Sequence, residues 1–223
     1  SPEEQHVGLT FPGVYGLLAQ IYLHTYGYTE EHLASISVKN HAHGVLNEKA
    51  HFRRYVTIDN VLESPYVAYP LKVLDSSPIS DGAAAVILTN KSGYLKNRKA
   101  VSILSSETAT DSISIAKRTN LDSLAATVIS AEKAFKTAGV DRSQIQIMEV
   151  HDCFSIAEIL ALEDLGFWKK GKGGALAKEM ATSRDSGNNL IVNTSGGLKA
   201  AGHPAGGTGI KQIGEIYLQL TGT

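Results

Sequence analysis

Apolar residues recur at helical spacing near the start of the chain. They fall at Val14, Leu17, Leu18, Ile21 and Tyr22. This spacing buries one face of a helix, and it predicts a helix from Gly13 to Tyr26 that Gly27 ends. Thr29 suits the N-cap of a second helix, which the pattern extends to about Gly44.

The next stretch lacks helical periodicity. Between Asn47 and Pro78, three prolines break the pattern into short extended pieces, including residues 67–74. The Asp81-Gly82 turn then introduces Ala83–Thr89, where small residues are followed by β-branched ones. That composition predicts a strand buried on both faces of a sheet.

After residue 100 the apolar pattern alternates between strand and helix. It predicts strands at 101–104, 145–150 and 191–193, and helices at 122–138, 155–165 and 209–220. Gly139 and Gly166 are the expected helix ends, and Ser155 is the expected cap of the second helix. This order predicts an α/β fold class. The polar residues 91–99 separate two apolar runs, so we expect a domain boundary near residue 93, between units 1–92 and 93–223.

Charge and cysteine content narrow the possible functions. The 223 residues carry a formal net charge of −1, with Lys and Arg scattered along the chain. This distribution argues against nucleic acid or an anionic membrane surface as partner. No run approaches the ~20 apolar residues needed to span a bilayer. A lone cysteine, Cys153, cannot form an internal disulfide, and we expect a reducing, cytoplasmic location.

The first group of candidate chemical residues is Glu149–Phe154, where a predicted strand gives way to a predicted helix. Strand ends that feed helix N-termini are common ligand sites in α/β folds. At such a place we expect the thiol of Cys153 to be more acidic than the ordinary ~8.5. The alternative is that Cys153 is a small buried apolar residue and His151 its satisfied neighbour.

The second group is Asn193–Gly209, which has six glycines in seventeen residues around one imidazole, that of His203. Such a backbone must approach something closely and adopt unusual φ angles. A phosphate-binding loop does not fit, because neither Gly-Lys-Ser/Thr nor Gly-x-Gly-x-x-Gly occurs in the segment. A glycine-rich turn without chemistry is the remaining alternative.

Together the two segments resemble the thiolase superfamily. The sequence His151-Asp152-Cys153-Phe154 and the pattern Gly-Gly-x-x-Ala-x-Gly-His-Pro-x-Gly-x-x-Gly at 196–209 are similar to the branch of sterol-carrier-protein-type thiolases and archaeal acetyl-CoA acetyltransferases. Further segments look like the same branch: Thr10-Phe-Pro-Gly, Lys39-Asn-His41, Pro70-Leu71 and Ser80-Asp-Gly-Ala-Ala84. The resemblance implies a partial thiolase-like fold: the rest of a loop domain, the last strand of the first half and most of the second half, without its final strands.

The resemblance also implies roles for individual residues. His203 would activate a nucleophilic thiol and donate into an oxyanion hole, His151 would complete that hole, and Cys153 would move a proton at the α-carbon. Ser195, Gly196 and Gly206 would contact substrate. The reaction would be Claisen condensation or thiolysis of a 3-ketoacyl-CoA, with coenzyme A or acetyl-CoA as substrate and no metal or tightly bound cofactor. A dimer or tetramer is expected, and a synthase or a zinc-ribbon/OB-fold protein is a possible partner.

One residue of the family pattern is missing. In the family, the nucleophilic cysteine precedes the region that matches this chain, and Cys153 is the only cysteine present. The chain could be part of a whole thiolase, one subunit of a split enzyme, or a thiolase-like protein without the nucleophile that acts as an aldolase or acyl-CoA-binding module. A further alternative makes Cys153 itself the nucleophile, with His203 as its base.

Overall fold

The N-terminal part of the chain is helical, as the sequence pattern predicts. In this computed structural model, which describes residues 1–90 and 99–222, α1 spans Pro2–His6, α2 spans Phe11–Tyr26 and α3 spans Glu30–Val45. Gly27 ends α2 with a φ of 71°, in the left-handed region that glycine adopts without strain. Thr29 is the N-cap of α3. Both predicted helices are therefore confirmed.

The segment predicted to be loop contains a short helix. α4 spans Ile58–Glu63, and the Thr57 hydroxyl accepts a hydrogen bond from the Asn60 N–H at 3.1 Å to cap it. Six residues are too few to show a periodic pattern, so the prediction missed it. The extended pieces predicted at 67–74 form β1, Tyr66–Ala68, and β2, Leu71–Lys72, which pair antiparallel, followed by a 3-10 turn at Val73–Asp75.

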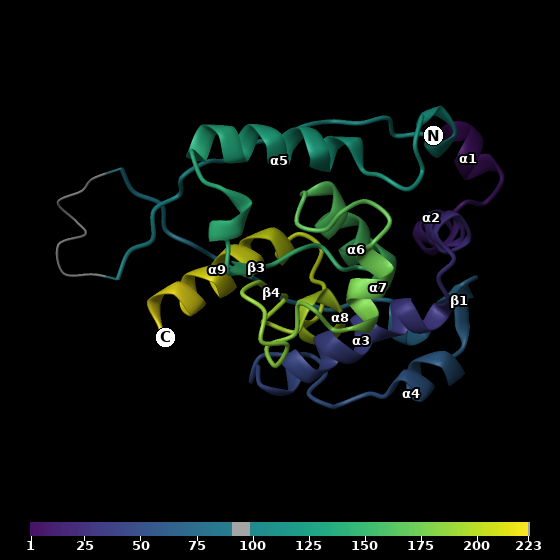
Figure 1. Ribbon diagram of the computed structural model, residues 1–223, viewed down its shortest axis with the longest axis horizontal. Coiled ribbons are helices and arrows are strands. Elements are labelled where there is room, and N and C mark those ends of the chain that lie inside the picture. The colour runs from purple at the N-terminus through teal and green to yellow at the C-terminus, as the bar shows by residue number, and fades with distance from the viewer. Residues whose placement is uncertain (91–98, 223) are drawn as a thin grey trace.

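Helices and two short parallel strands build the second part of the chain. α5 spans Ala125–Ala138 and ends at Gly139. β3, Ile147–Met148, pairs parallel with β4, Ile191–Val192. Between these strands lie α6, Ser155–Asp164, and α7, Gly173–Lys178; after them come α8, Gly197–Ala201, and α9, Thr208–Thr221 (Figure 1). Two further 3-10 turns lie at Ile115–Lys117 and Arg142–Gln144. Apart from the strand predicted at 101–104, the predicted strands and helices here are present but shifted or shortened at their ends, and α7 and α8 were not predicted.

Helix α6 lies at the centre of the molecule, between α5 and α3 (Figure 1). Its apolar side chains Ile156, Ile159, Leu160 and Leu162 are buried against Leu18 and Tyr22 of α2 and Leu33 and Ile36 of α3. One apolar core therefore draws on both sides of the predicted boundary at residue 93. That boundary lies outside the described residues and stays a prediction.

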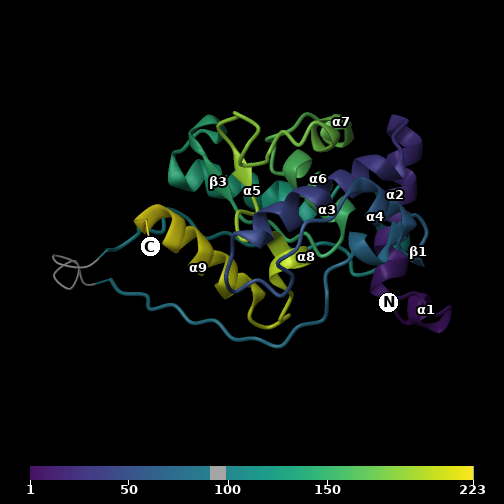
Figure 2. The ribbon, with the colours of Figure 1, turned by 90° about the horizontal axis from the view of Figure 1, so that it is seen from below.

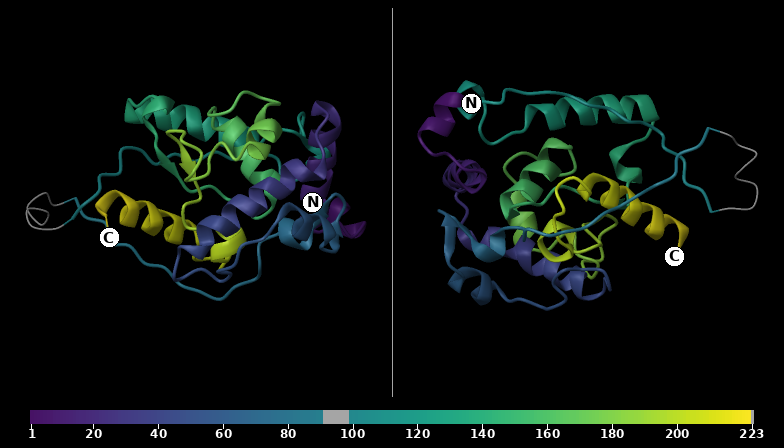
Figure 3. Two further views of the ribbon diagram at one scale, coloured as in Figure 1. Left: turned by 60° about the horizontal axis from the view of Figure 1, so that its bottom comes forward. Right: turned by 180° about the vertical axis from the view of Figure 1, so that it is seen from behind.

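Two of the predicted strands are wrong. Residues 83–89 and 101–104 are extended but belong to no sheet among the residues that the structure describes, and Ile87 is 96% exposed. Figure 2 shows the extended chain that precedes the grey residues running along the edge of the molecule, outside the helices, and the right view of Figure 3 shows it crossing the back face of the molecule. The composition does favour a buried strand, but a strand forms only beside a partner, and no described segment supplies one.

Across the described residues, no helix is long and apolar enough to cross a bilayer.

Candidate functional site

The two segments singled out in the sequence meet in space. β3 and β4 run parallel, so the loops that follow them, 149–154 and 193–196, leave the same edge of the sheet. The Val150 N–H donates to Asn193 Oδ1 at 2.9 Å and ties the two loops together. The rings of His151 and His203 then lie edge to face, with centroids 4.9 Å apart and an angle of 84° between their planes.

His203 is held by its own loop. Its Nδ1 lies 2.7 Å from the hydroxyl of Thr208, the first residue of α9, and its backbone N–H donates to Ser80 Oγ at 3.3 Å. Burial lowers the pKa of the imidazole, the nearby His151 lowers it further, and the carboxylate of Asp152 opposes both. The ring is therefore neutral at pH 7, which is the form that accepts a proton.

His151 is more open than its neighbours. Its side chain is exposed, yet the partial loss of water around the ring lowers its pKa. A neutral imidazole beside a second neutral imidazole offers one N–H donor and one acceptor nitrogen without the repulsion of two cations.

The expectation that Cys153 is unusually acidic is wrong. The thiol is buried, and burial raises its pKa to about 11, although the hydroxyl of Tyr15 and the ammonium of Lys199 oppose this shift. Phe154 is the N-cap of α6, and Cys153 precedes it. The helix N-terminus therefore stabilises the thiolate less than lost water destabilises it. The alternative interpretation, in which Cys153 is a small buried residue, is correct in that the side chain is buried. With this raised pKa, the thiol is protonated at pH 7.

Ser155 does not cap α6, contrary to the prediction. It is the first residue of that helix, and its hydroxyl donates to Asp75 Oδ1 at 2.7 Å. This contact instead ties the helix to the 3-10 turn at 73–75, on the other side of the predicted boundary.

A buried polar network lies directly beneath the site. Asp152, between His151 and Cys153, accepts hydrogen bonds from Asn40 Nδ2 at 2.7 Å and from the Leu198 N–H at 2.6 Å. The buried Lys39 pairs with the buried Glu158, and Glu158 also accepts from Asn40 Nδ2 at 2.8 Å. Burial raises the pKa of Asp152 and lowers that of Lys199, whose ammonium donates to the carbonyl of Asp75. The network fixes α3 against the loops that carry His151 and His203.

The three residues predicted to contact substrate differ in accessibility. Ser195 is buried, and its hydroxyl and N–H donate to the carboxylate of Glu149 at 2.8 and 3.0 Å. Gly196, with a φ of 98°, lies against Gly44 of α3, whose Cα is 2.7 Å from where a Cβ would stand. Gly206 is exposed and lines a cleft. Only Gly206 faces open space in the described structure, and all three substrate roles stay predictions.

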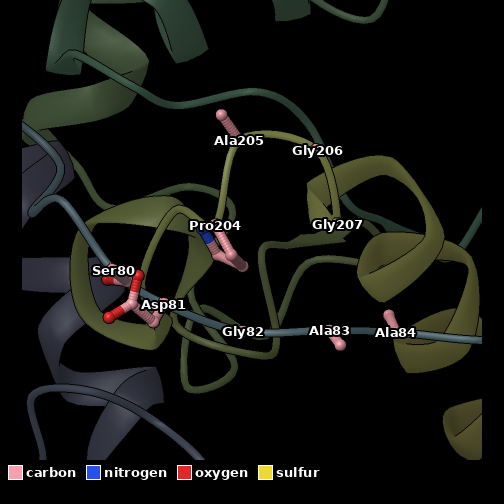
Figure 4. Close-up of a pocket in the computed structure, with 9 residues that line it drawn as sticks. All are labelled: Ser80, Asp81, Gly82, Ala83, Ala84, Pro204, Ala205, Gly206 and Gly207. Atoms are coloured by element: carbon pink, nitrogen blue, oxygen red, sulfur yellow. The ribbon is translucent and has the colours of Figure 1, made fainter.

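The cleft has a volume of about 420 Å³ and lies beside His203. Residues 80–84 form one wall and residues 204–207 the other, with Pro204 facing Gly82 (Figure 4). Backbone and small side chains dominate this lining. Among the described residues, no group of three or more His, Cys, Asp or Glu side chains is arranged to hold a metal ion.

The family described as Thiolase C-terminal domain-like matches residues 107–223. The chain belongs to this thiolase family. The sequence resemblance drawn from the His-Asp-Cys-Phe and glycine-rich motifs is thereby confirmed, as is the partial thiolase-like fold.

Curated relatives point to the same branch. The chain is 44% identical to an acetyl-CoA acetyltransferase of Methanothermobacter thermautotrophicus, over 98% of the chain and 57% of the relative. It is 42% identical to an acetyl-CoA acetyltransferase of Methanocaldococcus jannaschii, over 96% of the chain and 55% of the relative. It is 37% identical to sterol carrier protein 2 of Oryctolagus cuniculus, over 95% of the chain and 39% of the relative. The chain thus spans about half the length, or less, of these relatives.

A solved structure supports the fold. The Ltp2-ChsH2(DUF35) aldolase superposes with a TM-score of 0.79 over 98% of this chain and 58% of that one, at 20% identity. At that identity the likeness concerns the fold alone.

Sequence reasoning assigned no role to several residues that shape the site. Glu149 and Ser80 hold the two loops through hydrogen bonds, Thr208 holds the His203 ring, and Tyr15 reaches the Cys153 thiol from α2. Thr208 stands five residues after His203 at the start of the terminal helix, and this spacing was the one signal available in the sequence. Tyr15 is far from Cys153 in sequence and could not be linked to it.

Proposed function

We propose that this chain carries the His151, Cys153 and His203 part of an acyl-CoA thiolase, which condenses two acyl-CoA thioesters or cleaves a 3-ketoacyl-CoA with coenzyme A. The observation that carries the proposal is the meeting of two neutral imidazoles, with ring centroids 4.9 Å apart, next to an open cleft. The buried thiol of Cys153 lies two residues after His151 in the same loop. The family membership supports the same chemistry.

In the thiolysis direction, the protonation states of the three side chains assign each proton transfer. His203 takes the proton of a nucleophilic thiol, and the resulting thiolate attacks the 3-keto carbon. The bond between the α and β carbons breaks, and the electron pair moves into an enolate of the departing thioester. N–H donors of the two imidazoles stabilise the enolate oxygen; one such donor contributes roughly 3 kcal/mol. Cys153, protonated because its pKa is about 11, donates its proton to the α-carbon. Coenzyme A then gives its thiol proton to the Cys153 thiolate and attacks the acyl-enzyme, and the released nucleophilic thiolate recovers its proton from His203.

The nucleophilic thiol is not Cys153 in this proposal. The chain contains no second cysteine, so the nucleophile belongs to polypeptide outside these residues. We propose that coenzyme A binds as substrate, that no metal or tightly bound cofactor takes part, and that the intact enzyme forms a homo-oligomer. A partner with a zinc-ribbon/OB-fold, or a synthase, is a further proposal.

The test is acetyl transfer by the full-length polypeptide that contains this chain. Wild-type protein should form acetoacetyl-CoA from acetyl-CoA, or cleave it with coenzyme A, and His203→Ala should reduce the rate by at least about 10²-fold. His24→Ala, on the exposed face of α2, is the matched control and should retain full activity. An active His203→Ala variant contradicts the proposal.

A second candidate is a retro-aldol reaction on a 3-hydroxyacyl-CoA, or acyl-CoA binding without chemistry. The lone cysteine favours it, and the structural similarity to an aldolase subunit agrees with it at the level of the fold. Trapping of the acyl-enzyme separates the candidates. Label on a cysteine other than Cys153 supports the thiolase, label on Cys153 supports the Cys-His alternative, and retro-aldol cleavage without label supports the aldolase.

A further inference from the structure

We propose that Thr208 is a positioning residue for His203. Its hydroxyl holds the imidazole in the tautomer that carries its proton on Nδ1 and leaves Nε2 free to accept one. The tautomer follows from the contacts of Thr208 alone; its catalytic consequence rests on the proposed function.

The argument begins with the single proton of the Thr208 hydroxyl. Oγ1 lies 3.1 Å from the carbonyl oxygen of Pro204, four residues earlier, and donates to it. This contact is the usual back-bond of a threonine to the preceding turn. Because the hydroxyl proton is committed there, Oγ1 can only accept at its 2.7 Å contact with His203 Nδ1. A neutral imidazole has one N–H, so the proton sits on Nδ1 and the lone pair on Nε2.

Burial strengthens this arrangement. Thr208 is only 3% exposed, so water does not compete for its hydroxyl. The backbone N–H of His203 also donates to Ser80 Oγ, which holds the backbone in place. The imidazole can then change position only by rotation about its side-chain bonds. A half-turn about the Cβ–Cγ bond would bring a carbon to Oγ1 in place of Nδ1 and lose the hydrogen bond.

The charged and titratable groups around the ring come from two segments. His151 and Asp152 lie on the loop after β3. Lys211 lies on α9 and donates to the carbonyl of Gly202 at 3.0 Å. His151 and Lys211 lower the pKa of His203 and Asp152 raises it, while burial has the largest effect and lowers it. The neutral ring, for which the tautomer matters, is therefore the form present at pH 7.

In the proposed thiolase reaction this tautomer directs the proton. Nε2 accepts the proton of a cysteine thiol, which leaves a thiolate and an imidazolium. The Nδ1–H stays bonded to Thr208, and the new Nε2–H becomes the donor to the enolate oxygen. With the proton on Nε2 at the outset, the ring would present a donor to the thiol and could not activate it.

The experiment compares Thr208→Val with Thr208→Ser in the full-length polypeptide. Nitrogen-15 NMR of labelled histidine, with the His203 signals assigned by their loss in His203→Asn, reports which ring nitrogen carries the proton. We expect Nδ1–H in the wild type and in Thr208→Ser, and a shift toward Nε2–H in Thr208→Val. The acyl-transfer kcat should fall about 5- to 13-fold in Thr208→Val with KM little changed, because one hydrogen bond contributes about 1 to 1.5 kcal/mol.

The result that overturns the proposal is an Nε2–H tautomer in the wild type, or an unchanged tautomer in a folded Thr208→Val. If Thr208→Val fails to fold, the tautomer seen in the wild-type spectrum is sufficient to test the proposal. Wild-type protein with the Nδ1–H tautomer but without acyl transfer would contradict the proposed function and leave the role of Thr208 in place.

Discussion

The side chain of Asn193 connects the two loops of the site: its Oδ1 accepts a hydrogen bond from the Val150 N–H at 2.9 Å. Its Nδ2 donates to the buried Glu158 at 2.7 Å, so one amide links the loop after β4, the loop after β3 and helix α6. The backbone of Asn193 has a φ of 58°, a left-handed conformation that asparagine tolerates better than most residues.

Asn193→Gly tests this link without backbone strain, because glycine adopts positive φ freely. The substitution leaves a buried N–H and a buried carboxylate each without one partner. We expect the free energy of unfolding to fall by about 2 to 4 kcal/mol, and acyl transfer to fall with it because the two imidazoles lose their common support. Denaturant unfolding measures the first effect and steady-state kinetics the second.

Asn188→Gly is the control. Asn188 is exposed, and its Nδ2 donates to the Ala181 carbonyl at 2.8 Å. Its loss should cost less than about 1 kcal/mol. Equal destabilisation by both variants would contradict a special role for Asn193.

The two segments that meet at the candidate site could be recognised from sequence because each is a compact motif, while the roles of their residues stay predictions. His151 and Cys153 lie in one tetrapeptide and His203 lies in the glycine-rich loop, and the order of strand and helix is sufficient to bring the two together. Helices α2 and α3 were equally clear, because sixteen residues each give several helical turns.

The acidity of Cys153 was not predictable in the same way. Position at a helix start suggests a lowered pKa, but burial in the apolar core raises it, and that core includes residues of α2, more than a hundred residues earlier in the chain. The strand expected at 83–89 failed for a related reason: local composition favours a strand, and whether one forms depends on a neighbouring strand that no described segment provides. Both errors concern contacts between segments distant in sequence.

Tyr15→Phe should make Cys153 less acidic still. The Tyr15 hydroxyl lowers the thiol pKa by hydrogen bonding, so its removal should raise that pKa above about 11. The pH dependence of alkylation at Cys153, followed by mass spectrometry of its peptide in the intact protein, measures the shift. Tyr55→Phe, at a tyrosine that is 70% exposed, is the control. An unchanged alkylation profile in Tyr15→Phe would show that the hydroxyl does not act on the thiol.

Glu149 should make stability depend on pH. Burial raises its pKa from 4.5 to about 7, against the opposing effect of hydrogen bonds from Ser195. A carboxyl group whose pKa is higher in the folded state binds its proton more tightly there. Its contribution to stability is therefore greatest below pH 4.5 and is lost as pH rises from about 4.5 to 7, by at most about 3 kcal/mol.

Glu149→Gln should remove that part of the pH dependence. The difference in unfolding free energy between wild type and variant, measured at several values from pH 4.5 to 8, isolates the contribution of this one group. We expect the difference to change through this window and to be flat above about pH 8. A constant difference throughout would mean that Glu149 keeps an ordinary pKa in the folded protein.

Gly44 marks the closest approach of α3 to the glycine-rich loop. A Cβ at this position would lie 2.5 Å from the Cβ of Ala200, and the backbone of Gly44 is itself packed against Gly196. Gly44→Ala should therefore push α3 away from α8, at a cost of about 1 to 3 kcal/mol. Because α8 leads into the His203 loop, we also expect a lower kcat.

Gly214→Ala is the matched control, because Gly214 lies within α9 and nothing stands within 4 Å of where its Cβ would be. Alanine is preferred to glycine inside a helix, so this variant should be more stable by about 0.5 to 1 kcal/mol and fully active. If thermal unfolding shows that Gly44→Ala lowers the stability while Gly214→Ala raises it, the loss at Gly44 is due to the close approach of α3 and α8. If Gly44→Ala instead stabilised the protein as Gly214→Ala does, the contact between these two helices would be loose enough to admit a methyl group, and Gly44 would not be required for the position of His203.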